Sequence, residues 1–133
     1  MALLGLLLGK FLAYGAFFRW ATRLLGIRPT DPGGFAIKWA GIRLALGLLA
    51  IIPTFLLGAV LAWIVPSSDA LFYAEVYGIR ALIWAGLAAE ICRRQPSRRP
   101  IHRIVWVSLG LLINLLLDIT IHAAGLDDFK YFC

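Results

Sequence analysis

The feature that most constrains this chain is one long apolar segment in its first half. From Leu44 to Val65 no residue is charged, and a Pro-Ser-Ser-Asp sequence at 66–69 follows as a helix-ending signal. About 20 apolar residues in a helix match the thickness of the hydrocarbon core of a bilayer. Trp39 and Trp63 lie near the two ends, as interfacial anchors do. The segment therefore predicts a membrane-spanning helix.

The rest of the chain has the same character. Of its 133 residues 62% are apolar and 15% charged, whereas soluble domains have roughly 45–50% and 25%. A soluble protein of this size could not hide so much hydrocarbon from water. We therefore predict an all-α fold, a polytopic transmembrane bundle of about four helices with short loops. It forms one membrane domain over residues 1–133, with helices at approximately 2–25, 35–65, 70–92 and 101–124.

Glycine and proline divide these segments. The first loop is a breaker cluster at 26–34, and Thr30 or Asp31 before Pro32 is a plausible helix start. Pro53 predicts a kink in the second helix. Small residues recur along that helix at spacings of three and four, which would let another helix approach closely; they are Gly47, Ala50, Thr54, Gly58 and Ala62.

The first helix is short and carries Lys10 near its middle. That lysine is costly in a bilayer unless it snorkels or finds a partner. The helix could therefore span the membrane or lie at its interface. Gly5 and Gly9 add a second small-residue contact surface at GxxxG spacing.

Most lysine and arginine residues lie in or beside the first and third loops. Five flank the first loop (Arg19, Arg23, Arg28, Lys38 and Arg43) and five flank the third (Arg93, Arg94, Arg98, Arg99 and Arg103). The positive-inside rule then makes these loops cytoplasmic and puts the C-terminus outside, with a bacterial inner membrane as the default location. The third-loop arginines are expected to contact anionic lipid headgroups. We expect no nucleic-acid partner, because the +6 charge has no soluble basic face.

A polar stripe follows one face of the fourth helix. Gly110, Asn114, Asp118 and His122 recur at i, i+4 spacing. At about 1.5 Å rise per residue, Arg80 and Asp118 lie roughly 18 and 21 Å from the cytoplasmic ends of their helices. The same count puts Glu75 and His122 at roughly 25 and 27 Å. We therefore predict an Arg80–Asp118 pair, with Glu75 and His122 close together one turn farther out.

These residues admit three functions. The leading prediction is a small helix-packing subunit of a homo-oligomer or of a larger membrane complex, in which the stripe joins helices. One alternative is a minimal ion, proton or lipid transporter or channel along Arg80, Asn114, Asp118 and His122. The other is a membrane-embedded enzyme using a cluster of Glu75, Asp118 and His122, which could also ligate an ion.

Recognisable enzyme signatures are missing from the sequence. It has no Gly-x-Ser-x-Gly elbow, no phosphate-binding glycine loop and no His-Glu-x-x-His motif. The balance therefore leans against an enzyme, and we predict no cofactor and no bound metal.

Overall fold

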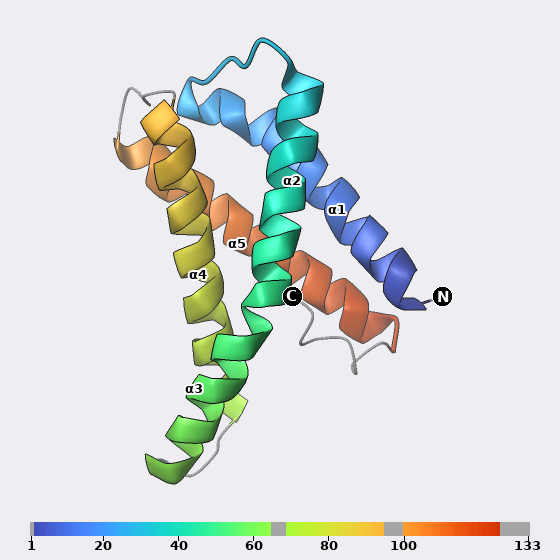
Figure 1. Cartoon of the computed structure of the whole chain (residues 1–133). Helices are drawn as coiled ribbons and strands as arrows, with labels where there is room; N and C mark the ends of the chain where they lie inside the picture. Colours follow the sequence, from blue (N-terminus) through green and yellow to red (C-terminus); the bar gives the residue numbers. More distant parts are fainter. Residues whose placement is uncertain (1, 65–68, 95–99, 126–133) are drawn as a thin grey trace.

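The computed structural model describes residues 2–64, 69–94 and 100–125, and the regular structure in these ranges is entirely helical (Figure 1). Predicted features at the second loop (65–68), at the basic turn with Arg98 and Arg99 (95–99), and in the tail from residue 126 lie outside the described residues. The elements are α1 (Ala2–Ala21), a 3₁₀ turn η1 (Thr22–Leu25), α2 (Pro32–Leu49), α3 (Ile51–Ile64), α4 (Asp69–Arg94) and α5 (Pro100–Ala123). The all-α prediction is confirmed.

The first loop is shaped by residues with special backbone roles. Gly26 ends η1 with a φ of 72°, a left-handed conformation that glycine adopts without strain. Asp31 caps α2, because its Oδ1 accepts hydrogen bonds of 3.0 Å from the backbone N–H groups of Gly33 and Gly34. Pro32 follows at the first helical position. The helix start expected at Thr30 or Asp31 is thus confirmed at Asp31.

The segment predicted as a kinked helix over 35–65 is divided into α2 and α3 at Ala50, three residues before Pro53. Pro53 has no N–H to donate to the carbonyl of Leu49, and its ring crowds the preceding turn. Hydrogen bonds resume on either side, from Ala50 N to Leu46 O at 2.9 Å and from Thr54 N to Ala50 O at 3.1 Å. The chain changes direction at this break (Figure 1).

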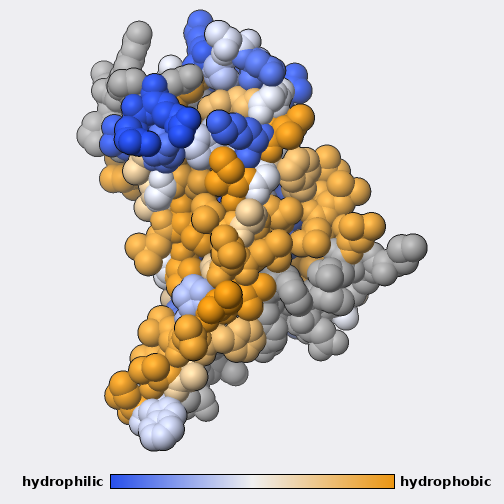
Figure 2. All heavy atoms as spheres, viewed as in Figure 1, coloured by the Kyte–Doolittle hydropathy of each residue, from blue (hydrophilic) through white to orange (hydrophobic). Residues whose placement is uncertain are grey.

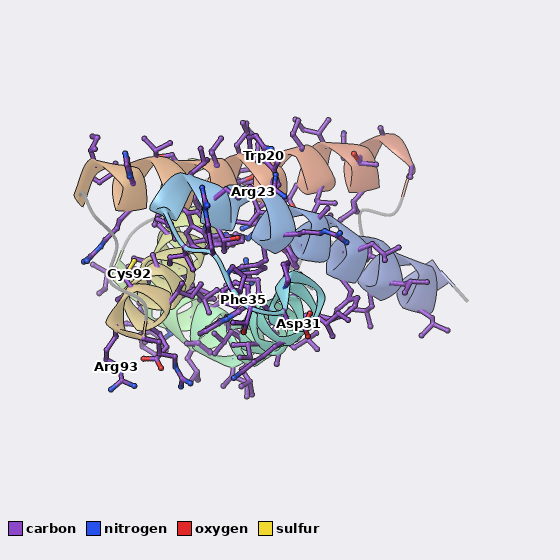
Figure 3. All side chains as sticks on the ribbon, turned by 90° about the horizontal axis from the view of Figure 1, so that it is seen from above. Trp20, Arg23, Asp31, Phe35, Cys92 and Arg93 are labelled. Atoms are coloured by element: carbon purple, nitrogen blue, oxygen red, sulfur yellow. The ribbon has the colours of Figure 1, made fainter. Side chains whose placement is uncertain are left out.

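The centre of the molecule is a cluster of large aromatic side chains. Seen from above, α1 lies between α5 on one side and α2 on the other (Figure 3). Phe17 and Phe18 of α1 pack against Trp84 of α4 and Trp106 of α5, with ring centroids 5.1–5.8 Å apart. Nearer the end of α4, Cys92 is buried, whereas the side chain of Arg93 is exposed (Figure 3). The core thus fills the half of the bundle nearest the first loop.

The outer surface is largely apolar. Hydrophilic residues gather at one end, over the first loop and the adjoining helix ends, and apolar residues cover most of the remaining visible face (Figure 2). Side chains such as Trp63 (93% exposed) and Leu82 (74% exposed) point away from the bundle. Within the described ranges, two stretches are long and apolar enough to cross a membrane, Pro32–Leu61 and Ile101–Ala123.

Candidate functional site

Asn114 is the centre of a buried polar network that joins four helices. The orientation of its amide group allows a hydrogen bond with each of three neighbouring side chains. The Nδ2 group then donates to the Tyr14 hydroxyl of α1 at 2.7 Å. The Oδ1 atom accepts from Arg43 Nη2 of α2 at 3.0 Å and from Trp84 Nε1 of α4 at 2.8 Å. One side chain of α5 therefore holds one side chain from each of α1, α2 and α4.

Arg43 is a correction to the sequence analysis, which counted it among the cations flanking the first loop. Its side chain is completely buried. The guanidinium carbon lies 5.1 Å from the ring centroids of both Tyr14 and Trp84, at cation–π distance. Arg43 is buried because it follows Pro32, the first residue of α2, by eleven residues. This distance is about 16 Å of helix, so the side chain lies away from the first loop. Arg43 is therefore an interior residue of the bundle.

Lys10 is buried as well, with 1% of its surface exposed. It belongs to a face of α1 whose buried members recur at helical spacing; they are Lys10, Tyr14, Phe17, Phe18 and Ala21. Because this face packs into the bundle, α1 is an integral part of the fold. The sequence analysis missed Tyr14 and Trp84 as polar partners, although the spacing along α1 was a readable signal.

A second polar contact joins α4 to α5 farther from the first loop. Arg80 Nη1 forms the predicted ion pair with Asp118 Oδ2, which confirms that contact. The Tyr77 hydroxyl donates to the same oxygen at 3.0 Å, and the Arg80 guanidinium lies 5.0 Å from the Tyr77 ring centroid. Arg80 is nearly buried, at 4% side-chain exposure, whereas Asp118 is 22% exposed. The carboxylate is thus held by two donors from α4.

Gly110, the first member of the stripe, has a steric role. A Cβ at this position would lie 2.5–2.7 Å from ring atoms of Trp84, closer than any packed side chain tolerates. The glycine therefore lets α5 approach the indole of α4, and that approach brings Trp84 Nε1 to Asn114. Gly110, Asn114 and Asp118 all face α4, as their spacing predicted.

Glu75 and His122, which were predicted to lie close together, face different surroundings. Glu75 turns toward α3, where a Cβ on Gly58 would lie 3.4 Å from its Oε2. His122 is exposed on α5, which diverges from α4 toward its C-terminal end (Figure 1). Among the described residues no three His, Cys, Asp or Glu side chains form a group that could hold a metal ion. The Glu75, Asp118 and His122 cluster is therefore not assembled as a three-ligand site.

An apolar cavity lies between α2–α3 and α4. It has a volume of about 380 Å³, and its walls include Gly47, Ala50, Thr54 and Gly58 on one side and Glu75 and Arg80 on the other. Four members of the small-residue stripe thus leave space beside α4. Glu75 Oε1 is screened from solvent, and no hydrogen bond reaches it from the described part of the chain. A shielded carboxylate oxygen therefore lies beside an apolar space at this cavity.

The hydrophilic end of the molecule carries exposed arginines. Arg93 and Arg94 form ion pairs with Glu90 at 2.9 and 2.8 Å, and the Glu90 carboxylate raises the pKa of Arg93. Arg103, the remaining described member of the predicted headgroup set, is also exposed. Across the end of the bundle, Arg19, Arg23 and Arg28 border a shallow hollow of about 820 Å³. Exposed positive charge is therefore available at this end.

Comparisons with protein-family models, with curated proteins and with solved structures find no match to this chain.

Proposed function

We propose that this chain is a polytopic integral membrane protein, with α1, α2–α3, α4 and α5 crossing the bilayer. The observation that supports this is the reversal of the usual arrangement of residues. Lys10, Arg43, Arg80 and Asn114 are inside, while leucine, isoleucine and tryptophan cover much of the outside. Soluble proteins bury apolar residues and expose charged ones. Lipid is the solvent in which this arrangement is stable.

The orientation follows from the basic end. The exposed arginines of α1, η1, α4 and α5 lie at the same end of the molecule as the first loop (Figure 2). The positive-inside rule makes that end cytoplasmic and puts the C-terminus on the opposite side. Its exposed arginines would contact anionic headgroups. A bacterial inner membrane is the proposed location.

Within the membrane we propose a helix-packing subunit rather than a conduit or an enzyme. The stripe supports this because Asn114 and Asp118 are engaged by side chains of the same chain. The four aromatic rings at the centre fill the space that a path along the stripe would need. Polar residues used in this way fix helices against each other.

The contact surface proposed for a further chain is the α3–α4 arm, defined as α3 together with residues 69–80 of α4. The arm extends beyond α1 and α5 at the end opposite the first loop (Figure 1). Its α3 face presents exposed apolar side chains, which are Ile52, Phe55, Leu56, Val60 and Trp63. A two-helix projection of this kind has more lateral surface to offer than the packed centre of the bundle.

Native mass spectrometry of the protein extracted from its own membrane tests the proposal. We expect a mass well above the 14.7 kDa of one chain. Val60→Trp, on the exposed face of α3, should release the additional chains, whereas Leu112→Trp, at an exposed position on α5, should not. A wild-type protein that remains a single chain in a mild membrane mimic would overturn the subunit proposal.

A further inference from the structure

The residues that line the cavity beside Glu75 indicate which kind of ligand it can bind. Its walls come from the small and apolar residues of α2–α3 and from apolar residues of α4, with polar atoms of Thr54, Glu75 and Arg80 at the edge. A volume of about 380 Å³ is within the usual range of small-molecule sites, roughly 300–1,000 Å³. The cavity is therefore large enough for a compact organic ligand.

The polar groups of the wall differ in how far they are satisfied. The Thr54 hydroxyl donates to the carbonyl of Ala50 at 2.8 Å, and the Arg80 guanidinium faces Asp118 and Tyr77. Glu75 Oε1 accepts no hydrogen bond from the described residues, although solvent does not reach it. An ionised carboxylate in apolar surroundings requires a cation or a hydrogen-bond donor. The Glu75 Oε1 atom is therefore available to a cation or a hydrogen-bond donor that enters the cavity.

The surroundings exclude some cations and favour others. A small inorganic cation such as Mg²⁺ or Ca²⁺ needs about six oxygen ligands, and the walls offer one carboxylate and one hydroxyl. A cation with apolar substituents gains free energy when these substituents leave water and contact the walls. The ring of Phe55, which also lines the cavity, is a suitable face for such a group, because aromatic rings attract alkylated ammonium ions.

We propose that the cavity beside Glu75 binds a small organic cation, an alkylated or aromatic ammonium ion, whose charge pairs with Glu75. Gly47 and Gly58 provide the space, since neither has a side chain to fill it. This site is separate from the buried network at Asn114. The proposal does not depend on whether the protein assembles with other chains.

The test is equilibrium dialysis of radiolabelled benzyltrimethylammonium against the full chain in nanodiscs, with empty nanodiscs as background. Neopentylbenzene, which has the same shape and no charge, is the matched probe. We expect saturable binding of the cation, at least about tenfold weaker in Glu75→Gln, because a buried charge pair loses one partner. Binding of the neutral probe should be weak and equal in both proteins.

Two further variants make the result decisive. Glu90→Gln removes a carboxylate of the same helix that pairs with Arg93 and Arg94 outside the cavity, and it should bind the cation as the wild type does. Gly58→Leu fills the cavity from α3, with its Cβ already 3.4 Å from Glu75 Oε2, and should abolish binding. It also carries the test if Glu75→Gln does not fold. Equal binding of the cation and the neutral probe, or undiminished cation binding in Gly58→Leu, overturns the proposal.

Discussion

Two regions of this protein use the same kinds of polar side chain in opposite ways. Around Asn114, hydrogen bonds join an amide, a guanidinium, a phenol and an indole from four helices inside the bundle. Beside Gly58, the Glu75 carboxylate faces an apolar cavity with one oxygen unengaged by the described residues. The first region is closed and the second is open. Their contrast shows that depth in the bundle does not by itself distinguish a polar residue that joins helices from one that could bind a ligand.

The largest effect is expected from breaking the closed region at its centre. Asn114→Ala removes the acceptor of Arg43 Nη2 and Trp84 Nε1, and it should lower the free energy of unfolding by about 3 kcal/mol. Reversible unfolding in bicelles measures this change. Leu115→Ala, at an exposed position on the same helix, is the control. A loss for Asn114→Ala no greater than for the control would show that the network does not hold the bundle.

The next effect is steric. In Gly110→Ala the new methyl group meets the Trp84 ring at 2.5–2.7 Å, so α5 must move away and the free energy of unfolding should fall by about 2 kcal/mol. The same substitution at Gly86, where a Cβ would have nothing within 4 Å, should be neutral or stabilising, because alanine is the better helix former. Both variants are compared in the same unfolding assay. Equal stability of the two would mean that α5 is not packed closely on α4.

A smaller effect is expected at the partly exposed ion pair. Asp118→Asn weakens the contact with Arg80 and with the Tyr77 hydroxyl, and polar contacts between membrane helices contribute about 0.6–2 kcal/mol. A double-mutant cycle with Tyr77→Phe measures their coupling, which should be positive because both act on one carboxylate oxygen. Additive losses would place Tyr77 and Asp118 in separate interactions.

The smallest effect is predicted in the open region. Glu75→Gln alters a carboxylate whose Oε1 atom accepts no hydrogen bond from the described residues, so the free energy of unfolding without ligand should change by less than about 0.5 kcal/mol or increase. The measurement is the same unfolding assay, run without added cation. A loss as large as that of Asp118→Asn would mean that Glu75 has a structural partner, and the difference between the two regions would disappear.

Much of the helical fold could be read from the sequence. Helix bounds follow from apolar segments and from breakers, as at Asp31-Pro32 and at Gly26. The Arg80–Asp118 contact followed from rise per residue alone, because both residues face the partner helix where α4 and α5 are still close. The same reasoning failed for Glu75 and His122. It gave their depth but not the divergence of the two helices, which turns Glu75 toward α3 (Figure 1).

The sequence by itself therefore determined the class of fold, the approximate helices and the separation of charge from hydrocarbon, because these depend on local composition and on helix geometry. Only the tertiary structure decided which polar groups meet. Arg43 is near the first loop in sequence, yet helix packing buries it beside Asn114. The small residues around Gly58 predicted close packing, but the break at Ala50 and the path of α4 left a cavity there. Such contacts depend on crossing angles and rotation between helices, which no segment encodes alone.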